Sequence, residues 1–275
     1  NPPAIAPKPK GEGPIVPIYI DCQTPVGWVP RGVALPKADI ARGINVLPNV
    51  PAFDWCYGCS ATSDAMMMGY YDRTGYPNMY TGPAGGGVCP LDNTTWGPRE
   101  CPLSASHLGI DGRVVKGHVD DYWIKSGNCD PDAWIGNWPE HMPWPDCTAD
   151  AMGTNQSVHE SCDGGTWFYY YNSGDPLYDY IAPAPRIDGC HGMRDYAETC
   201  GYTVLENFTQ LIQGYPGTEP GKGFSFEDYI VEIDAGRPVM IQIEGHSMVG
   251  VGYDDSPYTI YIHNTWDPSG YTMTW

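Results

Sequence analysis

Basic residues are scarce in this chain. Its 275 residues include 14 lysines and arginines against 33 aspartates and glutamates, giving a formal net charge of −19 at pH 7. A protein that binds nucleic acid needs clustered basic side chains to neutralise phosphates, so we expect no nucleic-acid partner. The same acidic balance makes the chain a poor ligand for an anionic membrane surface.

Long apolar runs are also missing. No stretch approaches the ~18 consecutive apolar residues of a membrane-spanning helix, so we expect no membrane span. Phenylalanine is rare, with 5 residues against 20 tyrosines and 10 tryptophans, yet hydrophobic residues make up 41% of the chain. That share predicts a packed core in one large domain or two small ones.

Cysteine, in contrast, is abundant. Ten cysteines are too many for an ordinary cytosolic protein, and they form no paired zinc-binding knuckles, so we expect disulfide bonds and a secreted, extracellular protein. Glycosylation sequons at Asn93, Asn155 and Asn207 fit an exported chain. If one cysteine is a free nucleophile, an odd number remains, and at least one more must be unpaired or bonded to another molecule.

Residues 54–72 contain the first candidate for chemistry. An aromatic, glycine-containing turn delivers Cys59 to the start of a predicted helix, whose apolar residues recur at helical spacing. Ser60 or Thr62 could accept hydrogen bonds from the free amides of the first turn. A thiol at the positive end of the helix dipole favours the reactive thiolate. The alternative is a cysteine in a disulfide or in the core.

Residues 245–267 contain the second candidate. His246 begins a predicted strand, a polar turn follows at residues 254–257, and Asn264 ends the next strand. Both side chains would then lie at the same end of a hairpin, where Asn264 could orient the imidazole. Asp267 is the backup orienter. Cysteine on a helix and histidine and asparagine on strands, in this chain order, give a papain-type arrangement.

Two blocks of motifs resemble a known family. The first has Tyr-Gly-Cys-Ser-x-Thr-Ser at 57–63 and Gly-Tyr-Tyr-Asp at 69–72; the second has Gly-His-Ser-Met at 245–248, Gly-Tyr-Asp at 252–254 and His-Asn-Thr-Trp-Asp at 263–267. These motifs cover about a fifth of the chain. They resemble the papain-fold cysteine peptidases related to bacteriocin-leader-processing peptidases, most of all their secreted bacterial relatives.

The resemblance implies a role for each site residue. Cys59 would be the nucleophile, His246 the general base and acid, and Asn264 the orienter, acting on a peptide or protein substrate. The family often has an oxyanion-hole glutamine six residues before the nucleophile, where this chain has Phe53, and Gln23 is the only glutamine upstream. Oxyanion stabilisation is worth several kcal/mol. The alternative is therefore a catalytically inactive extracellular structural or interaction protein on a papain-like scaffold, such as an assembly subunit.

The order of elements predicts an α+β fold. We expect a Pro-rich N-terminal arm and first strand at 1–21, the strand itself at 15–20, and a single papain-like domain at 22–275. An aromatic-rich, disulfide-stapled insertion would occupy about 83–190. The arm could mediate self-association by adding a strand to a neighbour's sheet. The start at Asn1 suggests a processed chain, and the strand-like end at Trp275 suggests that sequence follows.

Local patterns predict further elements. They are short helices at 104–108 and 119–125, longer helices at 190–201 and 225–235, and a strand at 238–244.

Two other chemistries compete with the peptidase interpretation. Residues 55–59 match the Trp-Cys-x-x-Cys redox motif, but the prolines before it leave little room for the strand that a thioredoxin-like site needs. The histidines lack the helical spacing of a zinc site, so we expect no metal and no cofactor. Calcium is weakly supported by acidic loops at 120–121, 130–132 and 254–255, which lack the regular EF-hand spacing.

Overall fold

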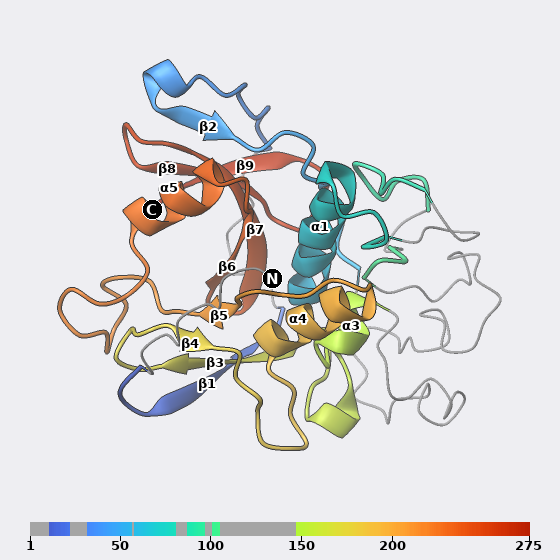
Figure 1. Cartoon of the computed structure of the whole chain (residues 1–275), viewed down its shortest axis with the longest axis vertical. Coiled ribbons are helices and arrows are strands. Elements are labelled where there is room, and N and C mark those ends of the chain that lie inside the picture. Colours follow the sequence, from blue (N-terminus) through green and yellow to red (C-terminus); the bar gives the residue numbers. More distant parts are fainter. Residues whose placement is uncertain (1–10, 23–31, 57, 81–86, 97–100, 105–146) are drawn as a thin grey trace, which may run out of the picture.

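The computed structural model describes residues 11–22, 32–56, 58–80, 87–96, 101–104 and 147–275 (Figure 1). Helices combine with antiparallel sheets in these parts of the chain, in agreement with the predicted α+β class. The helices predicted at 119–125 and, in large part, at 104–108 lie outside the described residues. The proposed domain boundaries and insertion stay predictions.

The largest sheet is formed mainly by the C-terminal part of the chain. β7 is central: β8 lies along one edge, and β6 and β2 pair with its two halves along the other. All of these pairings are antiparallel. The strands of this sheet are β2 (Ile44–Val46), β6 (Val239–Ile243), β7 (His246–Asp254), β8 (Thr259–His263) and β9 (Gly270–Thr274).

The predicted hairpin of residues 245–267 is confirmed. Its two strands are β7 and β8, which pair antiparallel and are joined by residues 255–258. Gly245, in the two-residue turn between β6 and β7, adopts φ 68°, a conformation that favours glycine. Val249 of β7 pairs with His263, the last residue of β8. The first residue of β7 and the residue after β8 therefore lie at the same end of the sheet, as the sequence predicts.

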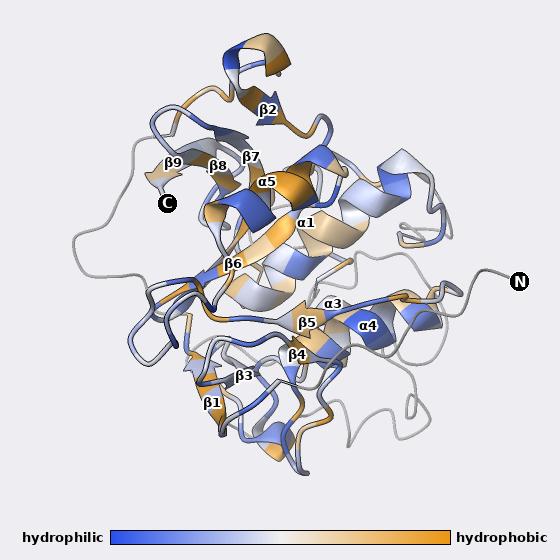
Figure 2. Cartoon of the chain, turned by 60° about the vertical axis from the view of Figure 1, so that its left-hand side comes forward, coloured by the Kyte–Doolittle hydropathy of each residue, from blue (hydrophilic) through white to orange (hydrophobic). Residues whose placement is uncertain are grey.

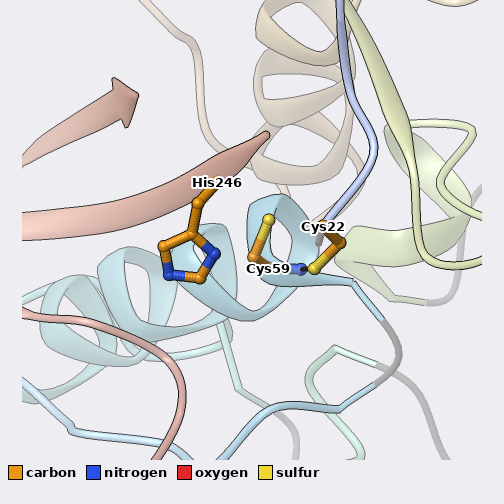
Figure 3. A group of neighbouring side chains, drawn as sticks. All are labelled: Cys22, Cys59 and His246. Atoms are coloured by element: carbon orange, nitrogen blue, oxygen red, sulfur yellow. Dashed lines mark hydrogen bonds between the residues drawn. The ribbon is translucent and has the colours of Figure 1, made fainter. Parts of the chain in front are cut away.

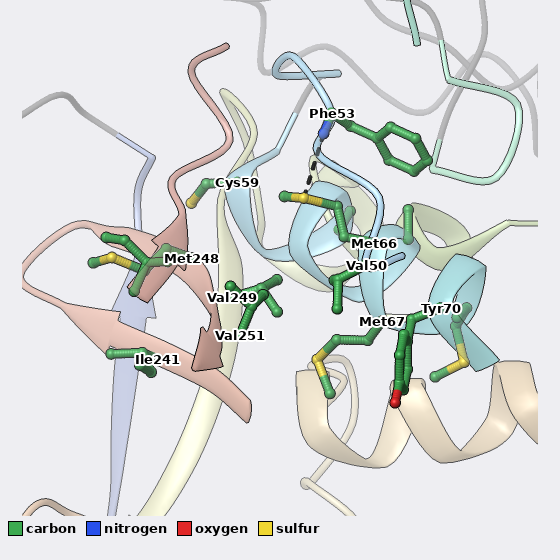
Figure 4. Close-up of a cluster of buried hydrophobic side chains, with 14 of the residues drawn as sticks. Val50, Phe53, Cys59, Met66, Met67, Tyr70, Ile241, Met248, Val249 and Val251 are labelled. Atoms are coloured by element: carbon green, nitrogen blue, oxygen red, sulfur yellow. Dashed lines mark hydrogen bonds between the residues drawn. The ribbon is translucent and has the colours of Figure 1, made fainter. Parts of the chain in front are cut away.

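Helix α1 (Cys59–Thr74) packs against β7 at the centre of the molecule (Figure 1). Nearly all of its residues are buried, so it is surrounded on every side. Met66 and Met67 contribute to a core that also contains Met248 and Val249 of β7 (Figure 4). Gly69 allows close packing, because a Cβ there would lie 2.7 Å from the sulfur of Cys89.

Both longer helices predicted near the C-terminus are present. They are α4 (Gly189–Thr199) and α5 (Phe226–Asp234). Ser225 caps α5 by accepting from the Asp228 amide at 3.1 Å, while the Asp228 carboxylate accepts from the Ser225 amide at 2.9 Å. α5 is amphipathic (Figure 2), with Tyr229 and Ile233 buried. It packs directly on β7, since a Cβ at Gly250 would lie 2.6 Å from the Tyr229 hydroxyl.

A second, two-stranded sheet is formed by β1 (Ile15–Ile20) and β3 (Thr166–Tyr171), and β3 also contacts α4. β1 is the predicted arm strand, and it pairs antiparallel with β3 of the same chain. Self-association through the arm stays a prediction. The remaining elements are η1 (Ile40–Arg42), α3 (Thr148–Ala151), η3 (Ser157–His159), β4 (Leu177–Tyr178) and β5 (Phe208–Thr209).

Both bonded and free cysteines occur in the described part of the chain. Cys162 is disulfide-bonded, whereas Cys22, Cys59, Cys89 and Cys190 carry free thiols. The predicted disulfide framework therefore does not extend to these four. The requirement that a free Cys59 be accompanied by another unpaired cysteine is met by Cys22, Cys89 and Cys190.

Within the described residues, no helix has the length and apolar character needed to cross a membrane.

Candidate active site

Cys59 is the first residue of α1, as predicted, and is completely buried. The turn before it requires glycine: Gly58 has φ 156°, and a Cβ there would lie 2.4 Å from Cγ2 of Thr154. The Cys59 thiol therefore lies at the positive end of the helix dipole, where a thiolate is stabilised. The backbone amide of Ser247 also donates to the Cys59 sulfur at 3.2 Å.

The predicted capping of this helix is wrong. The residue before the helix, Gly58, has no side chain to offer. Thr62 instead accepts from the Cys56 amide at 3.1 Å, and the Ser60 hydroxyl is 2.8 Å from that of Ser247. The Cys59 amide donates to another group altogether, the sulfur of Cys22, at 2.8 Å.

His246 is the first residue of β7 and faces Cys59 (Figure 3). Its Nε2 lies 2.7 Å from the backbone carbonyl oxygen of Asn264. A carbonyl only accepts, so Nε2 must carry a proton in this contact. Nδ1 has no hydrogen-bond partner within the described residues. The neutral ring is thereby held in the tautomer whose Nδ1 lone pair can take a proton from the thiol.

Aromatic stacking fixes the plane of the imidazole. The ring of Trp266 stacks on His246 with centroids 5.1 Å apart and an interplanar angle of 10°. Trp55 in turn stacks on Trp266 at 6.4 Å and 15°. The three rings form a column that connects the start of β7, the loop after β8 and the turn before α1. The plane of the His246 ring is therefore fixed by its aromatic neighbours.

The electrostatics favour an ion pair between nucleophile and base. Burial alone would raise the pKa of Cys59, but the neighbouring side chains of Cys22 and His246 together outweigh burial, and the pKa of the thiol lies well below its usual range. Burial would lower the pKa of His246, but the Cys59 sulfur raises it above the ordinary value. Both shifts favour transfer of the thiol proton to the imidazole, which would give the thiolate that a cysteine nucleophile needs.

Cys22 is the unexpected member of the site. It follows β1, and its sulfur accepts from the Cys59 amide and from Nε1 of Trp55, each at 2.8 Å. Burial and the neighbouring Cys59 raise the pKa of Cys22 well above its usual range. This shift favours the neutral thiol form of Cys22.

The same cluster supplies donors for a metal. The ligand atoms of Cys22, Cys59 and His246 lie within 4.8 Å of one another. Two cysteines and a histidine are ligand types that suit Zn²⁺. In this structure the Cys22 sulfur accepts hydrogen bonds from the Cys59 amide and from Nε1 of Trp55. The expectation that the site needs no cofactor stays a prediction.

The structure separates the two candidate orienters. The backbone carbonyl of Asn264 holds His246, while its side-chain Oδ1 accepts from the Trp266 amide at 3.0 Å. The Asp267 carboxylate accepts from the Ser269 amide at 2.8 Å and from the hydroxyl of Tyr271. Position 264 is therefore the one in contact with the base, through its main chain and not through the amide side chain that the sequence suggested.

The residue at the expected glutamine position takes no part in the site. Phe53 is fully buried, and its ring packs edge-on against Trp96. Gln23 lies outside the described residues. Sequence reasoning did not single out Cys22 or Trp55 as site residues. The Trp-Cys-x-x-Cys match drew attention to Trp55, but for redox chemistry.

The redox interpretation itself finds no structural support. Among the described residues, no strand leads directly into the motif at 55–59, and the sheets contain only antiparallel pairings. A thioredoxin-like site needs a βαβ context.

The structure places each of the three predicted glycosylation sites. Asn93 and Asn155 are buried, and their side chains hydrogen-bond to backbone groups at Asp54 and Gly164, so neither is accessible to a glycan in the folded chain. Asn207 is half-buried and donates to the Cys190 carbonyl.

Of the acidic loops considered for calcium, only 254–255 is described, and there Asp254 accepts from the amide of Ser256 in the turn. The loops at 120–121 and 130–132 lie outside the described residues.

Comparison with known proteins supports the peptidase interpretation. Residues 175–275 match the model of the Peptidase_C39 like family. No curated protein and no solved structure matches the chain. The matched segment contains His246 and Asn264, whereas Cys59 lies before it and is brought to His246 by the fold. The C-terminal part of this chain thus matches the kind of cysteine peptidase family that its motifs resemble.

Proposed function

We propose that this protein is a secreted cysteine peptidase with a papain-like core, which hydrolyses peptide bonds through Cys59, His246 and the main chain of Asn264. One observation carries the proposal: Cys59, at the start of α1, lies beside a histidine whose far nitrogen donates to a backbone carbonyl. The match of residues 175–275 to a peptidase family supports a peptide or protein substrate.

Acylation follows from the ion pair. The Cys59 thiolate attacks the carbonyl carbon of the scissile peptide, and the π-electron pair moves to the oxygen. The proton on Nδ1 of His246 passes to the leaving nitrogen as the C–N bond breaks. The products are an amine and a thioester on Cys59, with a neutral imidazole whose Nε2–H still donates to Asn264.

Deacylation reverses the role of the imidazole. Nδ1 takes a proton from water as the oxygen attacks the thioester carbon, and the C–S bond then breaks to regenerate the thiolate and imidazolium. Because Nε2 donates to Asn264 in both steps, the ring keeps one orientation while its charge changes.

Secretion is supported by composition. Ten cysteines in an acidic chain are typical of an oxidising compartment, and Cys162 is disulfide-bonded.

The test is cleavage of a defined peptide mixture. The chain would be incubated with a library of proteome-derived peptides, and new peptide ends would be quantified by mass spectrometry, with Cys59→Ala as the inactive variant and Cys89→Ala as the matched control. We expect cleavage by the unmodified chain and by Cys89→Ala, and none by Cys59→Ala or His246→Ala. Cleavage that persists in Cys59→Ala would come from a contaminant and would refute the proposal.

One observation favours the inactive-scaffold alternative. Cys59 and His246 are 0% exposed, and the Cys59 amide already donates to Cys22. A catalytically inactive relative of a peptidase could have its site occupied by a side chain of its own, as Cys22 occupies this one. A peptide library left intact by the unmodified chain and by Cys22→Ala would favour this alternative.

A further inference from the structure

Two N–H groups beside the nucleophile converge on one point. The Cys59 backbone amide and the Trp55 indole Nε1–H both lie 2.8 Å from the sulfur of Cys22. We infer that these two N–H groups form the oxyanion hole of the proposed peptidase, and that the Cys22 thiol fills the hole as an internal block. This inference rests on the proposed function and names the regulation of the same site.

The donor geometry is that of an oxyanion hole. Such donors lie about 2.7–3.1 Å from the position that the oxyanion takes, and both distances to Cys22 fall in that range. One donor is the amide of the nucleophile itself at the start of α1. The second comes from a side chain in the preceding turn. An oxygen at the sulfur's position would thus receive two hydrogen bonds beside the attacking thiolate.

Trp55 supplies the hydrogen-bond donor that a glutamine often supplies in the papain-fold peptidases that this chain resembles. The residue at the expected glutamine position, Phe53, is buried in the core and offers no side-chain donor. The indole of Trp55 is held by its stack on Trp266, which also stacks on His246. A donor fixed in this way needs little reorganisation during the reaction.

Cys22 stands where the substrate oxygen must go. A carbonyl oxygen cannot enter while the sulfur accepts both hydrogen bonds, so turnover requires the Cys22 side chain to leave. Its backbone has φ 60°, a strained conformation for a residue with a side chain. The sulfur of a thiol is a weaker hydrogen-bond acceptor than an oxyanion. The two N–H donors therefore bind the oxyanion of the transition state more strongly than they bind the Cys22 thiol.

The test compares two reactions of the same sulfur. Alkylation of Cys59 by iodoacetamide needs a thiolate but no oxyanion hole, whereas acylation by p-nitrophenyl acetate passes through an oxyanion. Both rates would be measured on the full chain in EDTA, with labelling at Cys59 verified by mass spectrometry. The variants are Trp55→Phe, which keeps an aromatic ring but removes the N–H, and Cys22→Ala. Their controls are Trp167→Phe and Cys89→Ala.

We expect Trp55→Phe to slow acylation by about 10²-fold while alkylation changes little, and Trp167→Phe to change neither. Cys22→Ala should raise the ratio of acylation to alkylation severalfold, and Cys89→Ala should not. Because Cys22→Ala leaves Trp55 intact, it tests the hole even if Trp55→Phe fails to fold. Parallel changes in the two rates, or an unchanged ratio in Cys22→Ala, would overturn the inference. A Cys59 that reacts with neither reagent in any variant would instead overturn the proposed function.

Discussion

At the scale of single residues, the site depends on backbone groups as much as on side chains. The amides of Cys59 and Ser247 and the carbonyl of Asn264 all make direct contacts within it. Sequence patterns report side-chain types, so they pointed to Cys59 and His246, which the fold brings together, and to the side chain of Asn264, whereas in the structure the main-chain carbonyl of Asn264 contacts His246. A main-chain role is invisible in a sequence, because any residue can provide it.

This assignment predicts a mild effect for Asn264→Ala. The carbonyl that holds Nε2 remains, and the loss is the side-chain hydrogen bond to the Trp266 amide, worth about 1 kcal/mol or roughly fivefold in rate. His246→Ala removes the acid and base and should cost about 10²–10⁴-fold. The measurement is the acylation rate of each variant with p-nitrophenyl acetate. Equal losses in Asn264→Ala and His246→Ala would show that the amide side chain is the orienter after all.

At the scale of elements, local signals predicted most of what surrounds the site. The arm strand, α1, α4, α5 and the hairpin of β7 and β8 appear where periodicity and turn residues placed them. Cys22 could not be placed beside Cys59 in this way. The two are 37 positions apart, and Cys22 reaches the site because β1 pairs with β3, a long-range pairing with no local signature. In the same way, the inferred replacement of the glutamine donor by the indole N–H of Trp55 is visible only in the folded structure.

The capping box of α5 supports the element that packs on β7. Ser225→Ala removes the acceptor for the Asp228 amide and should lower the free energy of unfolding by about 1 kcal/mol. Ser256→Ala, in an exposed turn, is the matched control and should stay within about 0.5 kcal/mol of the original chain. Urea titration of the three proteins checks this. A Ser225→Ala midpoint equal to that of the control would mean that the cap contributes nothing.

At the scale of the whole molecule, buried acids link stability to pH. Burial raises the pKa of Asp64 well above its ordinary value, and its carboxylate oxygens have no hydrogen-bond partner within the described residues. Burial also raises the pKa of Asp188 to about 7. In the folded chain both carboxyl groups are therefore more stable in their protonated form. The net charge of −19 adds general repulsion as the pH rises.

The sign of the pH dependence follows from proton binding. In the unfolded chain Asp188 loses its proton near the ordinary pKa of 3.8, whereas in the folded chain burial raises its pKa to about 7. Between these values the folded state binds more protons, so stability falls as the pH rises and levels off above about 7. Asp188→Asn should flatten this decline and stabilise the chain at pH 8 by a few kcal/mol. Urea midpoints at pH 5 and pH 8 test this, and an unchanged difference between them in the variant would contradict it.

The central claim is that Cys59 is a nucleophile activated by His246, and the pH dependence of its alkylation tests it most directly. The rate of iodoacetamide labelling at Cys59 would be followed by mass spectrometry from pH 5 to pH 10, in EDTA, for the unmodified chain and for His246→Ala. Because the pKa of Cys59 lies well below the ordinary thiol value of 9.0, labelling should stay fast at neutral pH and decline only in acid. In His246→Ala, Cys22 still lowers the pKa of Cys59 but the imidazole no longer does, so the rate at neutral pH should fall and the profile should move towards alkaline pH. Superimposable profiles for the two proteins, or a Cys59 that resists labelling throughout, would contradict the account.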